Sequence, residues 1–168
     1  YIGATTQVVQ NAKYFQQAGR TVAIVEMNHS GFFRDWSQME EDDSYQYDKG
    51  TECLTFKGID IYLDPSQITK IIRQKYDCMV YDYGCYYDAA FEHASFLEKD
   101  ITCLVGGSKV NEYASTNKAL LENMNRENMY YLFSFTSNKD AKDILKNMKD
   151  LAEHTMFPAY TPDMFVYA

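Results

Sequence analysis

The sequence lacks any cluster of basic residues. Its 168 residues include 16 Lys and Arg against 24 Asp and Glu, which gives a formal net charge of −8 at pH 7. Proteins that bind nucleic acid non-specifically carry a concentrated positive surface, and anionic membrane surfaces attract polybasic segments. The composition therefore argues against non-specific nucleic-acid binding and against adsorption to an anionic membrane.

A secretory signal, long apolar runs and paired cysteine motifs are also missing. No segment is apolar for the roughly 20 residues that a membrane-spanning helix needs. The four cysteines, at positions 53, 78, 85 and 103, show no C-x-x-C spacing. We interpret them as free thiols in a reducing, cytoplasmic setting rather than as zinc ligands or disulfides. The chain begins with Tyr1 rather than methionine, so we expect it to be a processed or trimmed piece of a longer product.

The apolar content is sufficient for one well-packed core. Apolar residues make up 46% of the chain and aromatic residues 15%, with 15 Tyr and 10 Phe. A chain of this length fits a single domain, residues 1–168. Tyrosine-rich surfaces occur both at the rims of cores and at binding sites, and both interpretations stay open here.

Strand-like and helix-like segments alternate along the chain. Near-continuous apolar runs predict strands buried on both faces at residues 21–27, 78–81, 101–105, 129–135 and 155–158, with a hairpin or edge strand over 53–63. Helices are predicted over residues 5–18, from 64 onward, and over 89–97, 109–126 and 138–151. Residues 28–50 are predicted to be a loop with one short helix and a solvated acidic run. This alternation predicts an α/β three-layer sandwich with a mostly parallel sheet, which binds ligands at the carboxyl ends of its strands.

The candidate site residues lie at those strand ends and at the start of the first helix. A glycine turn that leads into a helix offers N–H groups to an anion such as phosphate. Hydroxyl and carboxylate oxygens are the ligands that Mg²⁺ prefers. The residues at these places are 3–6, 26–28, 82–84, 106–109 and 136–138. Among them, the resemblance described next singles out Gly3, Ala4, Thr5, Thr6, Glu26, Asn28 and Asp82.

The order Gly-x-Thr-Thr, helix, VAIVEMN, YDCMVYDYG and DITCLVGG resembles the ParA/MinD-type P-loop ATPases over most of the chain. The resemblance implies a P-loop NTPase-like fold with ATP or ADP and Mg²⁺ as ligands. The family's phosphate loop runs Gly-Gly-x-Gly-Lys-Thr-Thr. The resemblance therefore places Gly3 on the last loop glycine, Thr5 on the metal-ligating hydroxyl and Thr6 on the next residue. It places Asp82 on the strand-end aspartate that supports the metal.

The chain departs from the family pattern at two positions. Ala4 falls where the family has its phosphate-binding lysine. Glu26 and Asn28 fall on an Asp-x-Asp pair, so an amide replaces the acid that helps to activate water. The resemblance also implies that the first strand and a signature lysine would precede Tyr1. We expect an apolar strand upstream, or another segment that occupies the place of this strand in the sheet.

Three functional hypotheses follow. The leading one is a degenerate ParA/MinD-like protein, bacterial and cytoplasmic, that acts as a regulator or scaffold through a protein partner or homodimer and hydrolyses ATP weakly or not at all. The second is an active ATPase switch that dimerises on ATP and receives the missing lysine function from upstream or from a partner subunit. The third is a receiver-like signalling domain that uses Asp82.

Structural interpretations stand beside each functional one. Thr5 and Thr6 can be helix caps, Asp82 a turn cap and Glu26 a satisfied strand-end carboxylate. The aromatic clusters at residues 83–87 and 32–36 can form a partner surface or pack at the rim of the sheet. His29 is a candidate ligand contact, Cys85 a candidate nucleophile, and residues 160–163 resemble the family segment near the base.

Overall fold

The computed structural model describes residues 3–39 and 45–159. The acidic run at 40–43 and the segment 160–163 lie outside the described residues. The chain forms two compact units, one of them Thr5–Phe91, and the other built from the residues that follow together with the first four. We describe each unit by itself.

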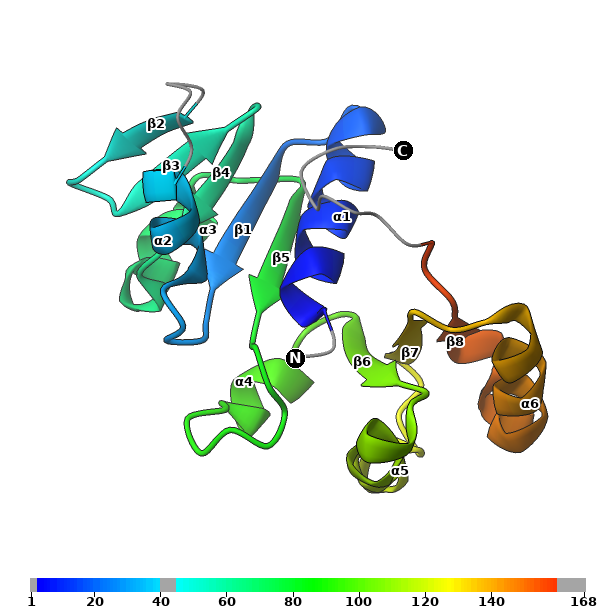
Figure 1. Ribbon diagram of the computed structural model, residues 1–168. Coiled ribbons are helices and arrows are strands. Elements are labelled where there is room, and N and C mark those ends of the chain that lie inside the picture. The colour runs from blue at the N-terminus through cyan, green and yellow to red at the C-terminus, as the bar shows by residue number, and fades with distance from the viewer. Residues whose placement is uncertain (1–2, 40–44, 160–168) are drawn as a thin grey trace. The chain divides into compact units, whose positions relative to one another are not determined.

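The Thr5–Phe91 unit contains a five-stranded sheet (Figure 1). Its order is β2-β3-β4-β1-β5, with strands β1 (Val22–Glu26), β2 (Tyr45–Asp48), β3 (Cys53–Phe56), β4 (Ile59–Tyr62) and β5 (Cys78–Asp82). Strand β1 is parallel to β4 and β5, whereas β2–β3 and β3–β4 are antiparallel. The sheet is therefore mixed rather than mostly parallel as predicted.

A tight turn makes β3 and β4 antiparallel neighbours. Lys57 and Gly58, with φ values of 48° and 78°, connect β3 to β4, as a two-residue hairpin requires. The predicted hairpin at 53–63 is confirmed. Strand β2 falls within the segment 28–50, which was wrongly predicted to contain no strand.

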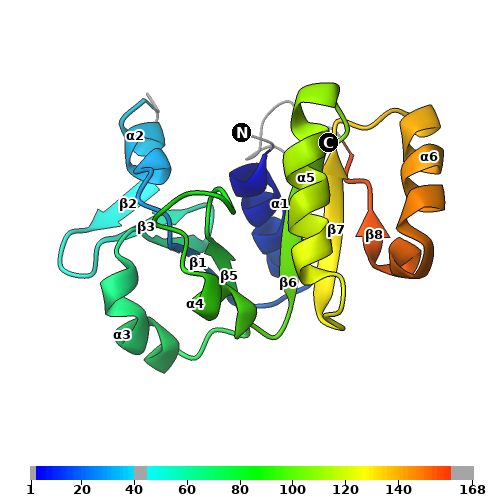
Figure 2. The ribbon, with the colours of Figure 1, turned by 90° about the horizontal axis from the view of Figure 1, so that it is seen from below.

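Helices cover both faces of this sheet. Helices α1 (Ala4–Gln17) and α2 (Phe32–Met39) lie on one face and α3 (Ile68–Arg73) on the other (Figures 1 and 2). A short 3₁₀ helix, η1 (Pro65–Gln67), precedes α3. All five residues of β1 are buried, as expected of a strand covered on both faces.

Hydrogen bonds between Thr21 and Asp77 join the amino ends of β1 and β5. The backbone N–H and hydroxyl of Thr21 both donate to Asp77 Oδ2, at 2.8 and 2.9 Å. The Asp77 N–H is 2.9 Å from the Thr21 hydroxyl oxygen. With this end fixed, the parallel register places Glu26 beside Asp82 at the carboxyl ends. Asp77 therefore supports the geometry of the candidate site from the opposite end of the strands.

The second unit contains a parallel sheet. Its order is β6-β7-β8, with β6 (Thr102–Gly107), β7 (Met129–Ser134) and β8 (Thr155–Met156). Its helices are α4 (His93–Leu97), α5 (Val110–Asn123), α6 (Asn138–Met148) and the 3₁₀ helix η2 (Lys149–His154). The Ser137 side chain caps α6, accepting from the Asp140 N–H at 3.2 Å. The sequence predicted these strands and helices, except that α4 begins later than residue 89.

The strand that the sequence led us to expect upstream does not border β1, because β1 is paired on both sides. Within the described ranges, β5 pairs with β1 alone and β6 with β7 alone. In the same ranges, no helix is long and apolar enough to cross a membrane.

Candidate functional site

Asp82 is the centre of a hydrogen-bonded cluster. Its side chain is 1% exposed, so each carboxylate oxygen needs a donor from the protein. The Thr5 hydroxyl donates to Oδ2 at 2.7 Å, and the Gly84 N–H donates to Oδ1 at 3.0 Å. Thr5 lies in the first turn of α1, which begins at Ala4. It therefore ties the start of this helix to β5, and the prediction that it caps the helix is wrong.

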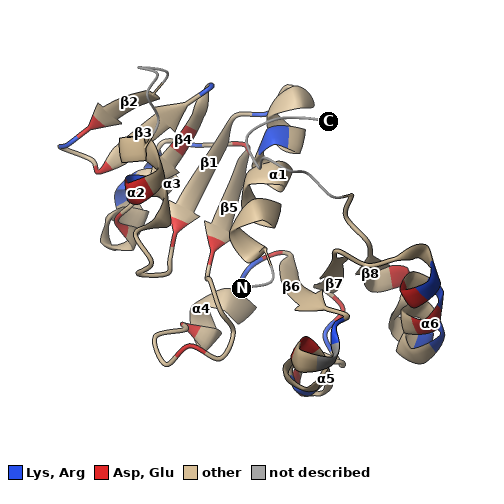
Figure 3. Cartoon of the chain, in the orientation of Figure 1, with Lys and Arg blue, Asp and Glu red and all other residues tan. Residues whose placement is uncertain are grey.

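Glu26 ends the neighbouring strand and is equally buried, at 2% exposed. The Ser30 hydroxyl donates to Glu26 Oε1 at 3.0 Å. The backbone N–H groups of Phe32 and Phe33, at the start of α2, lower the pKa of this carboxyl and so favour its charged form. An anionic side chain is favourable at a helix N-terminus, so Glu26 holds the first turn of α2. Figure 3 shows acidic residues at the tips of both β1 and β5.

Both polar atoms of the Asn28 side-chain amide are hydrogen-bonded. Its Nδ2 donates to the backbone oxygen of Asp82 at 3.1 Å, and its Oδ1 accepts from the Ser30 N–H at 3.0 Å. An ionised aspartate in the same place could accept but could not donate. The amide therefore links the end of β5 to the turn that precedes α2.

Burial raises the pKa of both carboxyl groups. For Asp82, burial is the largest effect, and the hydrogen bonds from Thr5, Gly84 and Asn28 oppose it. For Glu26, burial again dominates; the hydrogen bond from Ser30 opposes it and the charge of Asp82 raises the pKa further. The partners found for the two carboxylates among the described residues are neutral hydroxyl and N–H donors. Two negative charges at this edge therefore favour either protonation or a cation.

Ser30 belongs to the site but was not among the sequence candidates, and Gly84 was included only as part of the strand end 82–84. Each belongs to a short turn after a strand. The Ser30 N–H donates to the Asn28 side chain, and the Gly84 N–H donates to the Asp82 side chain. The sequence signals were Asn-x-Ser-Gly and Asp-x-Gly, which favour such turns. Gly84 has φ of 71°, and a Cβ there would lie 2.9 Å from Asn28 Cβ. Only glycine fits comfortably at this position.

The remaining candidates lie at the start of α1. Gly3 has φ of 84°, a conformation that glycine adopts readily, and Ala4 is the first helical residue. Thr6 follows on α1 and is half-buried. The oxygens of Thr5 and Asp82 suit Mg²⁺ chemically. Because the described residues hold no group of three or more metal-binding side chains, water and ligand oxygens would have to complete its coordination.

The two aromatic clusters have different environments. Phe33 is fully buried, and the Trp36 ring packs edge-on against Phe56 with centroids 4.7 Å apart. These contacts favour the packing interpretation for α2. In the other cluster, the Tyr86 and Tyr87 rings lie 5.1 Å apart, and Tyr87 is 42% exposed. This loop remains a candidate partner surface.

His29 and Cys85 are both exposed, and neither takes part in the hydrogen bonds that hold the Asp82 cluster.

Comparisons with known proteins place the fold. No protein-family model matches the chain, and no curated protein matches its sequence. The MinC:MinD cell division protein complex of Aquifex aeolicus matches with a TM-score of 0.66 and 14% identity, over 96% of this chain and 78% of that one. A putative plasmid partition protein of Borrelia burgdorferi, bound to AMPPNP, matches with a TM-score of 0.58 and 14% identity, over 97% and 82% of the chains.

The chain therefore has the fold of the ParA/MinD-type P-loop ATPases, as its sequence predicted. Cobyrinic acid a,c-diamide synthase of Mycobacterium smegmatis also matches, with a TM-score of 0.50 and 12% identity over 95% and 80% of the chains. Because this fold serves different chemistries, function has to be argued from the site.

Replacing Thr5 with valine tests the central hydrogen bond. Thr5→Val keeps the shape of the side chain but leaves Asp82 Oδ2 without its donor. We expect the free energy of unfolding to fall by about 1–3 kcal/mol, the usual cost of an unsatisfied buried polar group. Urea unfolding measures it, with Thr5→Ser and Thr6→Val as controls. An effect no larger than that of Thr6→Val would contradict the assigned role of Thr5.

Replacing Asn28 with aspartate tests the double role of the amide. Asn28→Asp restores the family's acid, but it removes the donor to Asp82 and adds a third carboxylate to the cluster. We expect a loss of about 1–3 kcal/mol in unfolding free energy at neutral pH. The loss should shrink toward about pH 5, because protonation removes the added repulsion and restores a donor. A variant as stable as the wild type at neutral pH would disprove this account.

Proposed function

We propose that this chain is a degenerate ParA/MinD-like protein that regulates or scaffolds a partner and hydrolyses ATP weakly or not at all. The observation that carries the proposal is Ala4 at the start of α1, next to a cluster with two buried carboxylates. A triphosphate at this helix N-terminus would lack a lysine and would meet the negative charges of Asp82 and Glu26. Losing one such charged partner weakens phosphate binding substantially.

Magnesium, when bound, would supply positive charge that reduces this repulsion, and it would act as a Lewis acid. Thr5 and Asp82 are the residues that would hold it. The AMPPNP in the similar Borrelia protein supports a nucleotide as the ligand class, with Mg²⁺ as its counter-ion. The site would then bind nucleotide as a weak sensor, without an acid at Asn28 to activate water.

For the partner, we propose a protein or a second copy of the chain that contacts the exposed loop around Tyr86 and Tyr87. MinD has been solved in complex with MinC, which supports a protein partner for a chain with this fold. We place the protein in a bacterial cytoplasm on the basis of the resemblance.

The alternative is an active ATPase switch that receives its lysine from elsewhere. The intact Thr5–Asp82 pair favours it, since these groups would hold the metal of a working site. The fold comparisons favour both P-loop hypotheses over a receiver-like domain.

We further propose that a strand outside this chain completes the protein by pairing with the outer edge of β5. Residues 78–81 of β5 are only partly buried, whereas all of β1 is buried, as expected if β5 lacks a neighbour. In a longer gene product that carries the upstream residues, hydrogen exchange at the β5 amides should be slower by about tenfold or more. Equal exchange in the two forms would reject this strand.

Calorimetric titration of Mg-ATP and Mg-ADP tests the proposed function. We expect the wild type to bind no tighter than millimolar and to show no turnover. Ala4→Lys should tighten binding by at least about tenfold, because it supplies a charged partner to the phosphates. Gln17→Lys adds the same charge at the far, exposed end of α1 and should change little.

Three results would contradict parts of this proposal. Micromolar binding with turnover by the wild type, lost in Asp82→Asn, would establish the active switch instead. Equal affinities in Ala4→Lys and Gln17→Lys would show that position 4 does not face the phosphates. Tight binding that survives Asp82→Asn would remove Asp82 from the site.

A further inference from the structure

The outer side of α3 carries basic residues in a chain that is acidic overall. Lys70 and Arg73 lie about one turn apart on the helix, and Lys75 follows its end; all three are exposed. Ile71, at 1% exposed, is the residue that α3 buries, whereas Ile72 is 56% exposed. Residues three apart share one side of a helix. The four exposed side chains, which we call the α3 surface, therefore combine positive charge with one apolar group.

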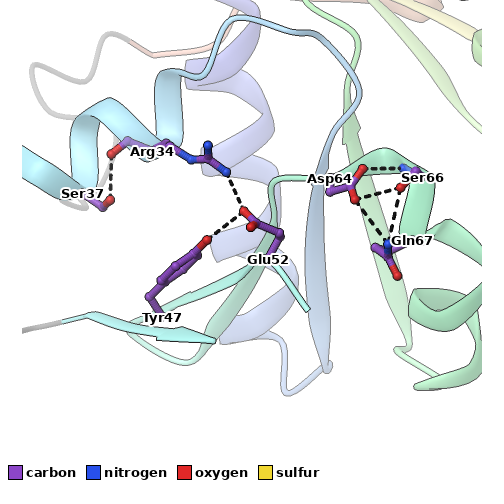
Figure 4. A network of polar contacts seen from close by, with 7 residues as sticks. All are labelled: Arg34, Ser37, Tyr47, Glu52, Asp64, Ser66 and Gln67. Carbon is purple, nitrogen blue, oxygen red and sulfur yellow. Dashed lines mark hydrogen bonds and ion pairs between the residues drawn. The ribbon is translucent and has the colours of Figure 1, made fainter. Parts of the chain in front are cut away.

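The charge of the α3 surface is not neutralised within the part of the chain that the structure describes. No ion pair between described residues includes Lys70, Arg73 or Lys75. The nearby Asp64 accepts from the Ser66 N–H and hydroxyl at 2.9 and 2.8 Å (Figure 4). These hydrogen bonds are the main reason that the pKa of Asp64 is lowered, and the charge of Lys70 adds a smaller effect. Three bases are too few for a nucleic-acid surface, so the α3 surface fits a short acidic segment of a protein.

The chain itself contains a segment of this kind, the run of four acidic residues at 40–43. The run follows Met39, the last residue of α2, which is 77% exposed. Helices α2 and α3 lie on opposite faces of the sheet (Figures 1 and 2), so Met39 is held on the face away from α3. Arg34, a base on α2, already pairs with Glu52, which also accepts from the Tyr47 hydroxyl at 2.7 Å (Figure 4). A second copy of the chain is therefore the occupant that these positions favour.

We propose that the acidic run at 40–43 of one copy docks on the α3 surface of a second copy. Four carboxylates then meet three bases, and Met39 supplies an apolar side chain to Ile72. If each copy gives both surfaces, the two contacts are related by a two-fold axis and close a dimer. Because the charges are exposed to solvent, the dimer is weak and sensitive to salt.

This contact is independent of the proposed function, because it uses neither the Asp82 cluster nor a nucleotide. The test therefore uses the whole chain without nucleotide. Analytical ultracentrifugation at roughly 100 µM protein follows self-association. The dissociation constant should rise by about tenfold or more between about 50 mM and about 500 mM salt.

Charge reversal with complementation identifies the two surfaces. One variant reverses the bases of the α3 surface: Lys70→Glu, Arg73→Glu and Lys75→Glu. The other reverses the acidic run: Glu40→Lys, Glu41→Lys, Asp42→Lys and Asp43→Lys. Each variant alone should be monomeric, because like charges then face each other. An equal mixture of the two should form a heterodimer, because every acidic surface again meets a basic one.

A third variant controls for the change in net charge. It reverses three exposed lysines of α6 instead: Lys139→Glu, Lys142→Glu and Lys146→Glu. This variant should dimerise like the wild type. Its mixture with the run-reversed variant should associate more weakly than the complementary mixture, because only one of the two contacts can form. Circular dichroism checks that all three variants are folded.

Several outcomes would overturn the proposal. A wild type that stays monomeric in low salt would show that the copies do not associate. An unchanged dimer in either the α3 or the run variant would place the association elsewhere on the chain. A complementary mixture that stays monomeric would show that the two surfaces do not meet. Equal association of the complementary and control mixtures would show attraction through net charge alone. Failure of nucleotide binding in the calorimetric titration would leave these results unaffected.

Discussion

The structure of the candidate site depends on one constraint: Asp82 is a buried carboxylate and must be hydrogen-bonded within the protein. Its two oxygens take the Thr5 hydroxyl and the Gly84 N–H, and its backbone oxygen takes the Asn28 amide. These three bonds fix the start of α1, the turn after β5 and the loop after β1. The parallel register adds Glu26 at the same edge, so two charges have to be accommodated where a single sheet ends.

The two departures from the family pattern, at Ala4 and Asn28, have opposite effects on the charge of the site. At these positions the resemblance implies one lysine and three carboxylates in the family. This chain has two carboxylates and no lysine there. The two sets have the same formal charge. In the correspondence that the resemblance implies, Ala4 stands in place of a positive group and Asn28 in place of a negative one, so the formal charge of the cluster is the same. Asn28 also supplies a donor to Asp82 that a carboxylate cannot supply. The amide is therefore a fitting replacement in a site without lysine, and not only the loss of a base.

Most of the framework could be predicted from the sequence, because buried strands and amphipathic helices carry strong local patterns. The strand runs and the 53–63 hairpin followed from them. The resemblance predicted the ParA/MinD-type fold and placed Thr5 and Asp82 at one site. The roles of Ser30 and Gly84 did not follow, because they depend on which turn forms at each strand end. Strand β2 was missed because Tyr45–Asp48 is mostly exposed and lacks an apolar signal.

Hydrolysis and structural support place different demands on the residue at position 28. Hydrolysis needs charge on the phosphates and a group that orients water, and neither the Ala4 methyl group nor the Asn28 amide is an acid or carries a charge. Structural support needs a side chain that donates and accepts at the same time. Asn28 does both, since it bonds Asp82 and Ser30. The group that is poorly suited to activating water is thus the one that joins the end of β5 to the turn before α2.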